Sequence, residues 1–144
     1  MTFAFRNVRE LTLDRCIFPL QRSSVFDLFI ISRPGTNLTS LTVKGNLCED
    51  IFYQLDRCRI RLKRLSLKSC FLEYYNPCPM ACLQDLEFLE IKNYKMRGAQ
   101  AWPRPDHYAK ACKKLKVLIF HNKDQFYIHG LGDLIKNSKE TLEV

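Results

Sequence analysis

The sequence has no apolar run approaching the roughly 18 residues of a membrane-spanning helix, so we expect no transmembrane segment. Its first residues, Met-Thr-Phe-Ala-Phe-Arg, lack the apolar stretch and the small-residue cleavage site of a secretory signal peptide. Glycine is scarce, with 5 among 144 residues, and no Gly-rich phosphate-binding loop occurs. These absences argue against membrane, secreted and nucleotide-binding proteins, and they predict a cytoplasmic or nuclear location.

Residue patterns typical of catalysis are also missing. No carboxylate pair stands in a motif, and the three histidines show no arrangement with a cysteine and a third group that would activate a nucleophile. A set of four possible zinc ligands can be selected, Cys78, Cys82, His107 and Cys112, but its spacing matches no zinc finger. We therefore expect no enzyme activity, no metal and no cofactor.

What the sequence does have is a surplus of positive charge, +8 from 23 Lys and Arg against 15 Asp and Glu. Such a surplus suits an acidic or phosphorylated protein, or a nucleic acid, and a solvated basic surface without a partner is the alternative. With 47% hydrophobic residues, the chain has the composition of a globular protein and the length of one domain.

Leucines recur in one rhythm along the chain, as in LKRLSLKSC at residues 62–70. Five copies of this rhythm begin at Val8, Leu38, Leu62, Leu86 and Leu115, with separations of 30, 24, 24 and 29 residues, and a sixth begins at Leu142. The pattern L-x-x-L-x-L-x-x-N/C is that of leucine-rich repeats. The fourth and sixth positions of each copy point to one face of a short strand and are expected to enter the core.

The predicted fold is therefore an α/β leucine-rich-repeat solenoid, or horseshoe, with parallel strands on its concave face and short helices on its convex face. One domain of about five repeats would span residues 1–144, with strands near 9–14, 39–44, 63–68, 87–92 and 116–121. Helical patterns return the chain between strands, the last from Leu131 to Ile135, and residues 95–103 are the expected insertion. No polar capping repeat is found at either end, so we expect a segment of a longer solenoid.

The ninth position of three copies carries a small, semi-polar side chain: Cys16, Asn46 and Cys70. We expect this position to turn the chain inward, where the side chain meets backbone groups of the neighbouring turn. Leaving such groups unpaired would cost roughly 1–3 kcal/mol each. We interpret the three residues as a structural turn ladder, and the two thiols as core groups rather than nucleophiles.

The segment from Cys112, CKKLKVLIFHNKDQFYIHGLGDLIKNSKETLEV, resembles the cysteine-containing repeat of the F-box/leucine-rich-repeat proteins. In that repeat a Cys precedes the strand pattern by three residues, and Cys58 and Cys82 approximate this feature four residues before Leu62 and Leu86. The resemblance implies a substrate receptor of an SCF-type ubiquitin ligase, with the substrate held by the horseshoe. This chain contains no F-box, so binding to the cullin scaffold and its adaptor would need an F-box outside it.

Stacking of repeats turns equivalent strand positions into columns on the concave face, which is where solenoids usually bind their partners. One column carries three lysines in successive repeats, and an apolar corner adjoins it. The residues expected to bind the partner are Lys44, Arg64, Lys68, Lys92, Phe88, Val117, Ile119 and His121. We predict that they bind an acidic or phosphorylated protein segment through an aromatic anchor and charge steering. The alternatives are nucleic-acid binding, with Phe88 stacking on a base, and an adaptor or scaffold role outside any ligase.

Overall fold

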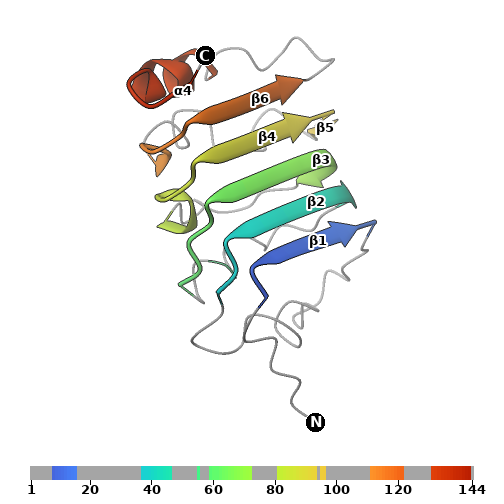
Figure 1. Ribbon diagram of the computed structural model, residues 1–144. Helices are drawn as coiled ribbons and strands as arrows, with labels where there is room; N and C mark the ends of the chain where they lie inside the picture. Colours follow the sequence, from blue (N-terminus) through green and yellow to red (C-terminus); the bar gives the residue numbers. More distant parts are fainter. Residues whose placement is uncertain are drawn as a thin grey trace.

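The structure is a computed structural model of the 144-residue chain. It describes residues 8–15, 37–46, 55, 59–72, 81–93, 95–96, 111–121 and 131–143. A parallel β-sheet dominates these residues (Figure 1), formed by β1 (Glu10–Asp14), β2 (Ser40–Asn46), β3 (Arg64–Leu72), β4 (Phe88–Lys92), β5 (Lys95–Met96) and β6 (Val117–His121). The helical elements are the 3-10 helix η1 (Ala81–Leu83) and the α-helix α4 (Leu131–Ser138). Neither of these described helices is long and apolar enough to cross a membrane.

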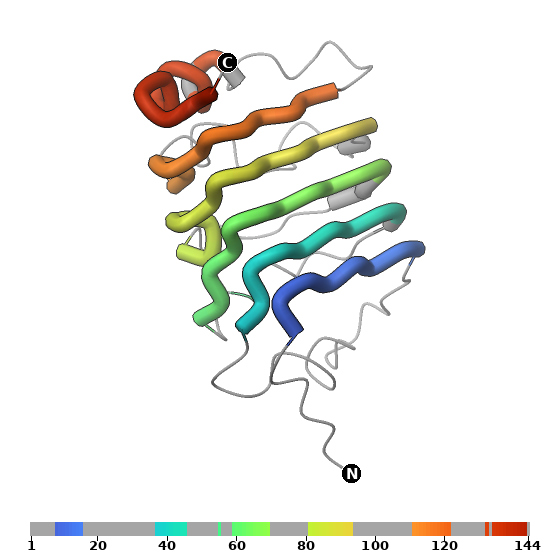
Figure 2. The backbone as a smooth tube through the Cα atoms, in the orientation of Figure 1, coloured from blue at the N-terminus to red at the C-terminus, as the bar shows by residue number. Residues whose placement is uncertain are grey.

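The main strands lie side by side in chain order, β1-β2-β3-β4-β6, and each pairs with its neighbour in parallel (Figure 2). Because consecutive strands run in the same direction, the chain has to return to the same end of the sheet before each new strand begins. The observed architecture is thus a sequential parallel sheet with few helices, which is compatible with the predicted solenoid. All five main strands begin one residue later than the predicted ranges, at residues 10, 40, 64, 88 and 117.

The strand register aligns the residues that the repeat pattern places in one column. The fourth positions pair as Leu11, Leu41, Leu65, Leu89 and Leu118, and the sixth positions as Leu13, Val43, Leu67, Ile91 and Phe120. From β2 to β4 these side chains are buried, together with the leucines that open repeats two to five. Burying each such side chain contributes about 1.5–3 kcal/mol, so this layer of leucines holds the repeats together.

Helix α4 completes the described core at the β6 end of the sheet (Figure 1). Its Leu134 belongs to the buried cluster, and the buried Ser138 donates a hydrogen bond from its Oγ to the carbonyl of Cys112 at 3.3 Å. The hydroxyl of Thr141 donates in turn to the carbonyl of Leu115 at 2.6 Å. The short helix predicted from Leu131 is therefore confirmed, and it extends three residues beyond Ile135.

A repeating hydrogen-bond pattern marks the start of each strand. The carbonyl of Arg9 accepts the N–H groups of both Thr39 and Ser40, at 2.9 and 3.0 Å. We call this arrangement, in which one carbonyl accepts two consecutive N–H groups, the two-to-one carbonyl bond. It recurs at the carbonyls of Thr39, Lys63 and Glu87. The N–H of Glu143 donates to the carbonyl of Lys116 at 2.8 Å, so the first of the two bonds recurs at the sixth copy predicted from Leu142.

The strands end in a way that the repeat pattern did not predict. In four repeats the eighth position has a positive φ: 51° at Arg15, 87° at Gly45, 52° at Ser69 and 50° at Asn93. The register between β2 and β3 shifts around this position, and Asn46 pairs with Phe71 rather than with Cys70. The backbone therefore departs from regular strand geometry at the eighth position, one residue before the expected turn ladder. Of that ladder, Cys16 and the side chains of Asn46 and Cys70 lie outside what the structure describes.

Strand β3 also runs further than expected, because it acquires a second partner beyond the irregularity. Phe71 and Leu72 pair in parallel with Lys95 and Met96 of β5, alongside the main path of the sheet. The first two residues of the predicted insertion are thus a short strand, which pairs with β3 in the same register that joins Lys68 to Lys92.

Candidate functional site

Alternate residues of the main strands point away from the leucine core, because successive side chains of a strand lie on opposite faces of a sheet. We call this side of the sheet the polar face; it comprises Glu10, Thr12, Asp14, Ser40, Thr42, Lys44, Arg64, Ser66, Lys68, Phe88, Glu90, Lys92, Val117, Ile119 and His121. The register aligns Lys44 with Lys68, Lys68 with Lys92, and Lys92 with His121. The lysine column predicted from the sequence is thus a row of neighbours across β2, β3 and β4.

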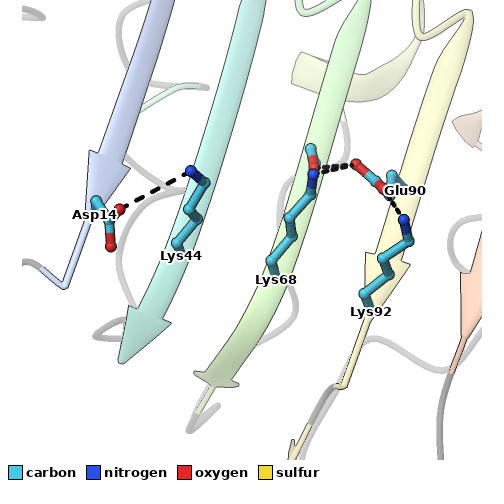
Figure 3. Close-up of polar contacts among 6 residues, drawn as sticks. Asp14, Lys44, Lys68, Glu90 and Lys92 are labelled. Carbon is cyan, nitrogen blue, oxygen red and sulfur yellow. Dashed lines mark hydrogen bonds and ion pairs between the residues drawn. The ribbon is translucent and has the colours of Figure 1, made fainter.

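Two of these lysines share one carboxylate, that of Glu90 on β4 (Figure 3). The Nζ atom of Lys68 lies 3.0 Å from Oε2 of Glu90, and the Nζ atom of Lys92 lies 2.7 Å from Oε1. The hydroxyl of Ser66, directly opposite Glu90 on β3, donates to Oε2 at 2.5 Å. The column is therefore not a bare ladder of positive charge but part of an ion-pair network across two strands.

The carboxylate lies beneath the ammonium groups that hold it. The side chain of Glu90 is only 9% exposed, whereas those of Lys68 and Lys92 are 38% and 41% exposed. Burial by itself raises the pKa of Glu90, but the hydrogen bonds from Lys92, Ser66 and Lys68 outweigh it and lower that pKa from 4.5 to about 2. Glu90 is consequently ionised at neutral pH and anchors both lysines on the polar face.

The third lysine of the column is held more loosely. The Nζ atom of Lys44 lies 3.9 Å from a carboxylate oxygen of Asp14 on β1, and both side chains are well exposed (Figure 3). A long ion pair in water contributes little free energy, so this contact does not fix Lys44 in one position. His121 ends the column as an exposed residue on β6.

An aromatic contact stands beside the network at the other end of the strands. The guanidinium carbon of Arg64 lies 4.1 Å from the ring centroid of Phe88, its register partner on β4. A cation at this distance is attracted by the face of the ring. Phe88 is therefore covered by a guanidinium rather than open as an aromatic platform. Val117 and Ile119 of the predicted apolar corner follow on β6 as half-buried residues beside Phe88 and Glu90.

These contacts define a compact candidate site, the β3–β4 site, made of Arg64, Ser66, Lys68, Phe88, Glu90 and Lys92. Two ammonium groups contact one carboxylate, and the guanidinium of Arg64 lies on the neighbouring Phe88, so the six residues together carry a net charge of two positive units. An ammonium group carries three N–H donors, so the bond from Lys92 to Glu90 leaves it able to donate to another acceptor. The arrangement can bind an anionic group approaching the polar face.

Comparisons of the chain with protein-family models, curated proteins and solved structures find no match in any of the three. The ligand of the β3–β4 site is therefore inferred from the residues themselves.

Other basic residues lie at the starts of the strands and contact acidic or amide groups that precede β4. The Nζ atom of Lys114 lies 2.5 Å from Asp85, and that of Lys116 lies 2.9 Å from Glu87. Arg61 donates to the side chain of Gln84. Hydrogen bonds from the two lysines lower the pKa values of Asp85 and Glu87. The basic residues here are interleaved with acids between neighbouring repeats, so they do not form an uninterrupted cationic track.

Two cysteines that the structure describes, Cys82 and Cys112, are core residues. Cys82 and Cys112 are buried and free of disulfides, and burial raises the pKa of the Cys112 thiol to about 12. Such a thiol stays protonated at neutral pH and is a poor nucleophile. Of the zinc set considered above, Cys78 and His107 lie outside the described residues. Across the part of the chain that the structure describes, no cluster of three or more His, Cys, Asp or Glu could hold a metal ion.

Glu90 is the functional residue that sequence reasoning missed. The repeat pattern places it between the core residues Leu89 and Ile91, pointing to the opposite face, but does not show that two lysines share its carboxylate. A signal was present: Glu90 is the lone acid of the fifth position, with Lys92 two residues later and Lys68 diagonal to it on the neighbouring strand. Long side chains reach such diagonal neighbours on one face of a sheet, so this pattern indicates an ion-pair network.

Proposed function

We propose that this chain is a leucine-rich-repeat protein whose polar face binds an acidic or phosphorylated segment of another protein. Three features that recur from strand to strand support the repeat class: the leucine register, the two-to-one carbonyl bond and the positive φ at the eighth position. Recurrence of one local geometry in every repeat is what a stacked-repeat fold requires.

The observation that carries the binding proposal is the arrangement of Lys68 and Lys92 around Glu90. Lysine normally loses considerable side-chain entropy when it is held by a ligand. Here both ammonium groups are already restrained by one carboxylate, while about two-fifths of each side chain stays accessible. A ligand anion would meet convergent donors that are positioned in advance, which lowers the entropic cost of binding.

The resemblance to F-box/leucine-rich-repeat proteins extends the proposal to a cellular role. In it, the chain holds the substrate of an SCF-type ubiquitin ligase in the cytoplasm or nucleus, and contact with the cullin scaffold and adaptor is made through an F-box outside these residues. Support for this step is the cysteine-containing repeat pattern, in which Cys82 and Cys112 are buried beneath the strands that they precede. A partner whose ubiquitylation is unaffected by loss of this protein would contradict the ligase role alone.

The binding proposal is tested by affinity recovery from cell lysate, with and without phosphatase or nuclease, followed by mass spectrometry. The test variant is Lys68→Gln with Lys92→Gln, and the matched control is Lys113→Gln with Lys139→Gln, which removes the same charge from exposed positions outside the polar face. We expect a protein that the wild type and the control recover, and that the test variant or phosphatase treatment loses. Equal recovery by both variants would contradict the site, and recovery abolished by nuclease would assign the positive charge to nucleic acid.

A further inference from the structure

The β3–β4 site has two parts at a set separation along the strands. The first part is the guanidinium of Arg64 on the ring of Phe88, and the second is the pair of ammonium groups at Glu90. Phe88 and Glu90 are two residues apart on β4 and lie on the same face. Two residues of a strand span about 6.6 Å, so the Phe88 and Glu90 positions on which the two parts are built stand about this far apart along β4.

Glu90 holds the ammonium groups near its own position along β4. Lys68 and Lys92 stand at the seventh position of their repeats, two residues beyond Glu90 along the strands. Free lysine side chains would extend into solvent in many directions. The contacts of 3.0 and 2.7 Å to the carboxylate instead bring both ammonium groups back to the level of the fifth position. Glu90 is in this sense a positioning residue for the anion-binding groups.

The first part of the site can accept an aromatic side chain. A guanidinium is planar, and aromatic rings stack on its faces through cation–π and π contacts. The guanidinium carbon of Arg64 lies over the ring of Phe88, 4.1 Å from its centroid, and Arg64 is an exposed residue. The side of the guanidinium that is turned away from Phe88 can receive a second ring from a ligand.

The site as a whole, with the two ammonium groups at Glu90 and the guanidinium of Arg64 on Phe88, matches a phosphate better than a carboxylate. Lys68, Lys92 and Arg64 together with Glu90 carry a net charge of two positive units, from three cations and one anion. A phosphorylated side chain carries about −1.5 to −2 charges at neutral pH and offers three acceptor oxygens. It would neutralise both of these positive charges, whereas a carboxylate would neutralise only one.

We propose that the β3–β4 site recognises an extended peptide segment in which a phosphorylated side chain and an aromatic side chain stand two residues apart. In an extended chain, residues i and i+2 point to the same side at about 6.6–6.8 Å, which matches the separation of the Phe88 and Glu90 positions on which the two parts are built. The phosphate binds between Lys68 and Lys92, and the aromatic ring stacks on Arg64. This inference rests on the proposed function and specifies its ligand.

The experiment measures the binding of fluorescein-labelled nine-residue peptides by fluorescence anisotropy. All share a Gly/Ser/Thr background with one phosphothreonine. Phenylalanine stands two residues away on either side, one residue away, or is replaced by alanine, and a further peptide carries unphosphorylated threonine. We expect one of the two peptides with the two-residue spacing to bind tightest, and shifting the ring, removing it or removing the phosphate to weaken binding about tenfold.

Protein variants assign each part of the site. Arg64→Gln should abolish the preference for phenylalanine, while Lys68→Gln with Lys92→Gln should weaken all phosphopeptides by a similar factor. The Lys113→Gln and Lys139→Gln pair serves as the control, and circular dichroism verifies that every variant is folded. Lysine-dependent phosphopeptide binding that is indifferent to ring position would overturn this inference and leave the proposed function intact. Absence of lysine-dependent binding, or displacement of the peptides by short single-stranded RNA at lower concentration, would overturn both.

Discussion

The Nζ atom of Lys92 lies 2.7 Å from the carboxylate of Glu90, two residues earlier on the same strand. Lys68 on the neighbouring strand holds the other oxygen of that carboxylate at 3.0 Å. Two lysines that are equivalent in the repeat pattern are thus joined through an acid from a different repeat position. The charge of the polar face is consequently organised by β3 and β4 as a pair, and we expect substitutions in either strand to affect the same ligand.

Replacing Glu90 with Gln should lower stability in a pH-dependent way. Because the folded state lowers the pKa of Glu90 to about 2, the ionised carboxylate stabilises the fold above pH 4.5 and loses this effect as the pH falls toward 2. We expect Glu90→Gln to reduce the free energy of unfolding at pH 7 by about 2 kcal/mol, with the difference from wild type shrinking below pH 4.5. Urea unfolding at pH 7, 4 and 3 measures it, with Glu10→Gln on exposed β1 as the control. A difference that stays constant over this range would contradict the role of the ionised carboxylate.

Truncating Leu65 should be among the most damaging substitutions in the sheet. This side chain is 1% exposed at the fourth position of β3, in the middle of the leucine layer. Leu65→Ala removes buried surface and leaves a cavity, so we expect a loss of about 2–5 kcal/mol in the free energy of unfolding. Ile135→Ala on α4 is the matched control, because Ile135 is 45% exposed and should lose less than about 1 kcal/mol. Similar losses in both variants would refute the strand register.

The eighth repeat position should be sensitive to an added side chain and tolerant of a removed one. Gly45 has a φ of 87°, and a Cβ atom there would lie 3.3 Å from the Cα atom of Arg15. We expect Gly45→Ala to destabilise the fold by about 1–2 kcal/mol, because a left-handed conformation is unfavourable for alanine and the neighbouring backbone is close. Ser69 has a similar left-handed conformation with a φ of 52°, so Ser69→Gly should change stability much less. Equal losses in both variants, measured by thermal and urea unfolding, would show that backbone conformation is not the cause.

The thiol of Cys112 should resist alkylation in the folded protein. Its side chain is fully buried, and burial raises its pKa to about 12, so almost no thiolate exists at pH 8. Incubation with iodoacetamide at pH 8, followed by peptide mass spectrometry, should leave Cys112 unmodified in native protein and modify it fully in urea. Modification within minutes under native conditions would contradict its place in the core.

The leucine layer and the starts of the strands could be predicted from the sequence, because both depend on local periodicity. Leu41, Leu65 and Leu89 recur at one position of a repeated pattern, and alternation along a strand then determines which face they enter. The strand ends could not be placed as well. Gly45 and Asn93 are residue types that tolerate a positive φ, but Arg15 and Ser69 adopt it without any such signal.

The candidate site was predictable as a set of positions and not as a set of contacts. Repeat spacing placed Lys44, Lys68 and Lys92 in one column, and the register aligns them. Which carboxylate each lysine approaches depends on side-chain direction across neighbouring strands. Repeat spacing carries no information about that direction, so the convergence on Glu90 emerged only from the structure.

Because of the two-to-one carbonyl bonds at the strand starts, the geometry of the sheet does not depend on the length of the chain between strands. Successive copies are 24 to 30 residues apart, yet the strands from β1 to β6 join through the same pair of N–H donors to one carbonyl. Each strand is therefore aligned by its immediate neighbour, whatever the intervening chain contributes. Insertions and deletions between strands would be accommodated without altering the spacing of Arg64, Lys68 and Lys92, so loop lengths can diverge during evolution while the polar face keeps its dimensions.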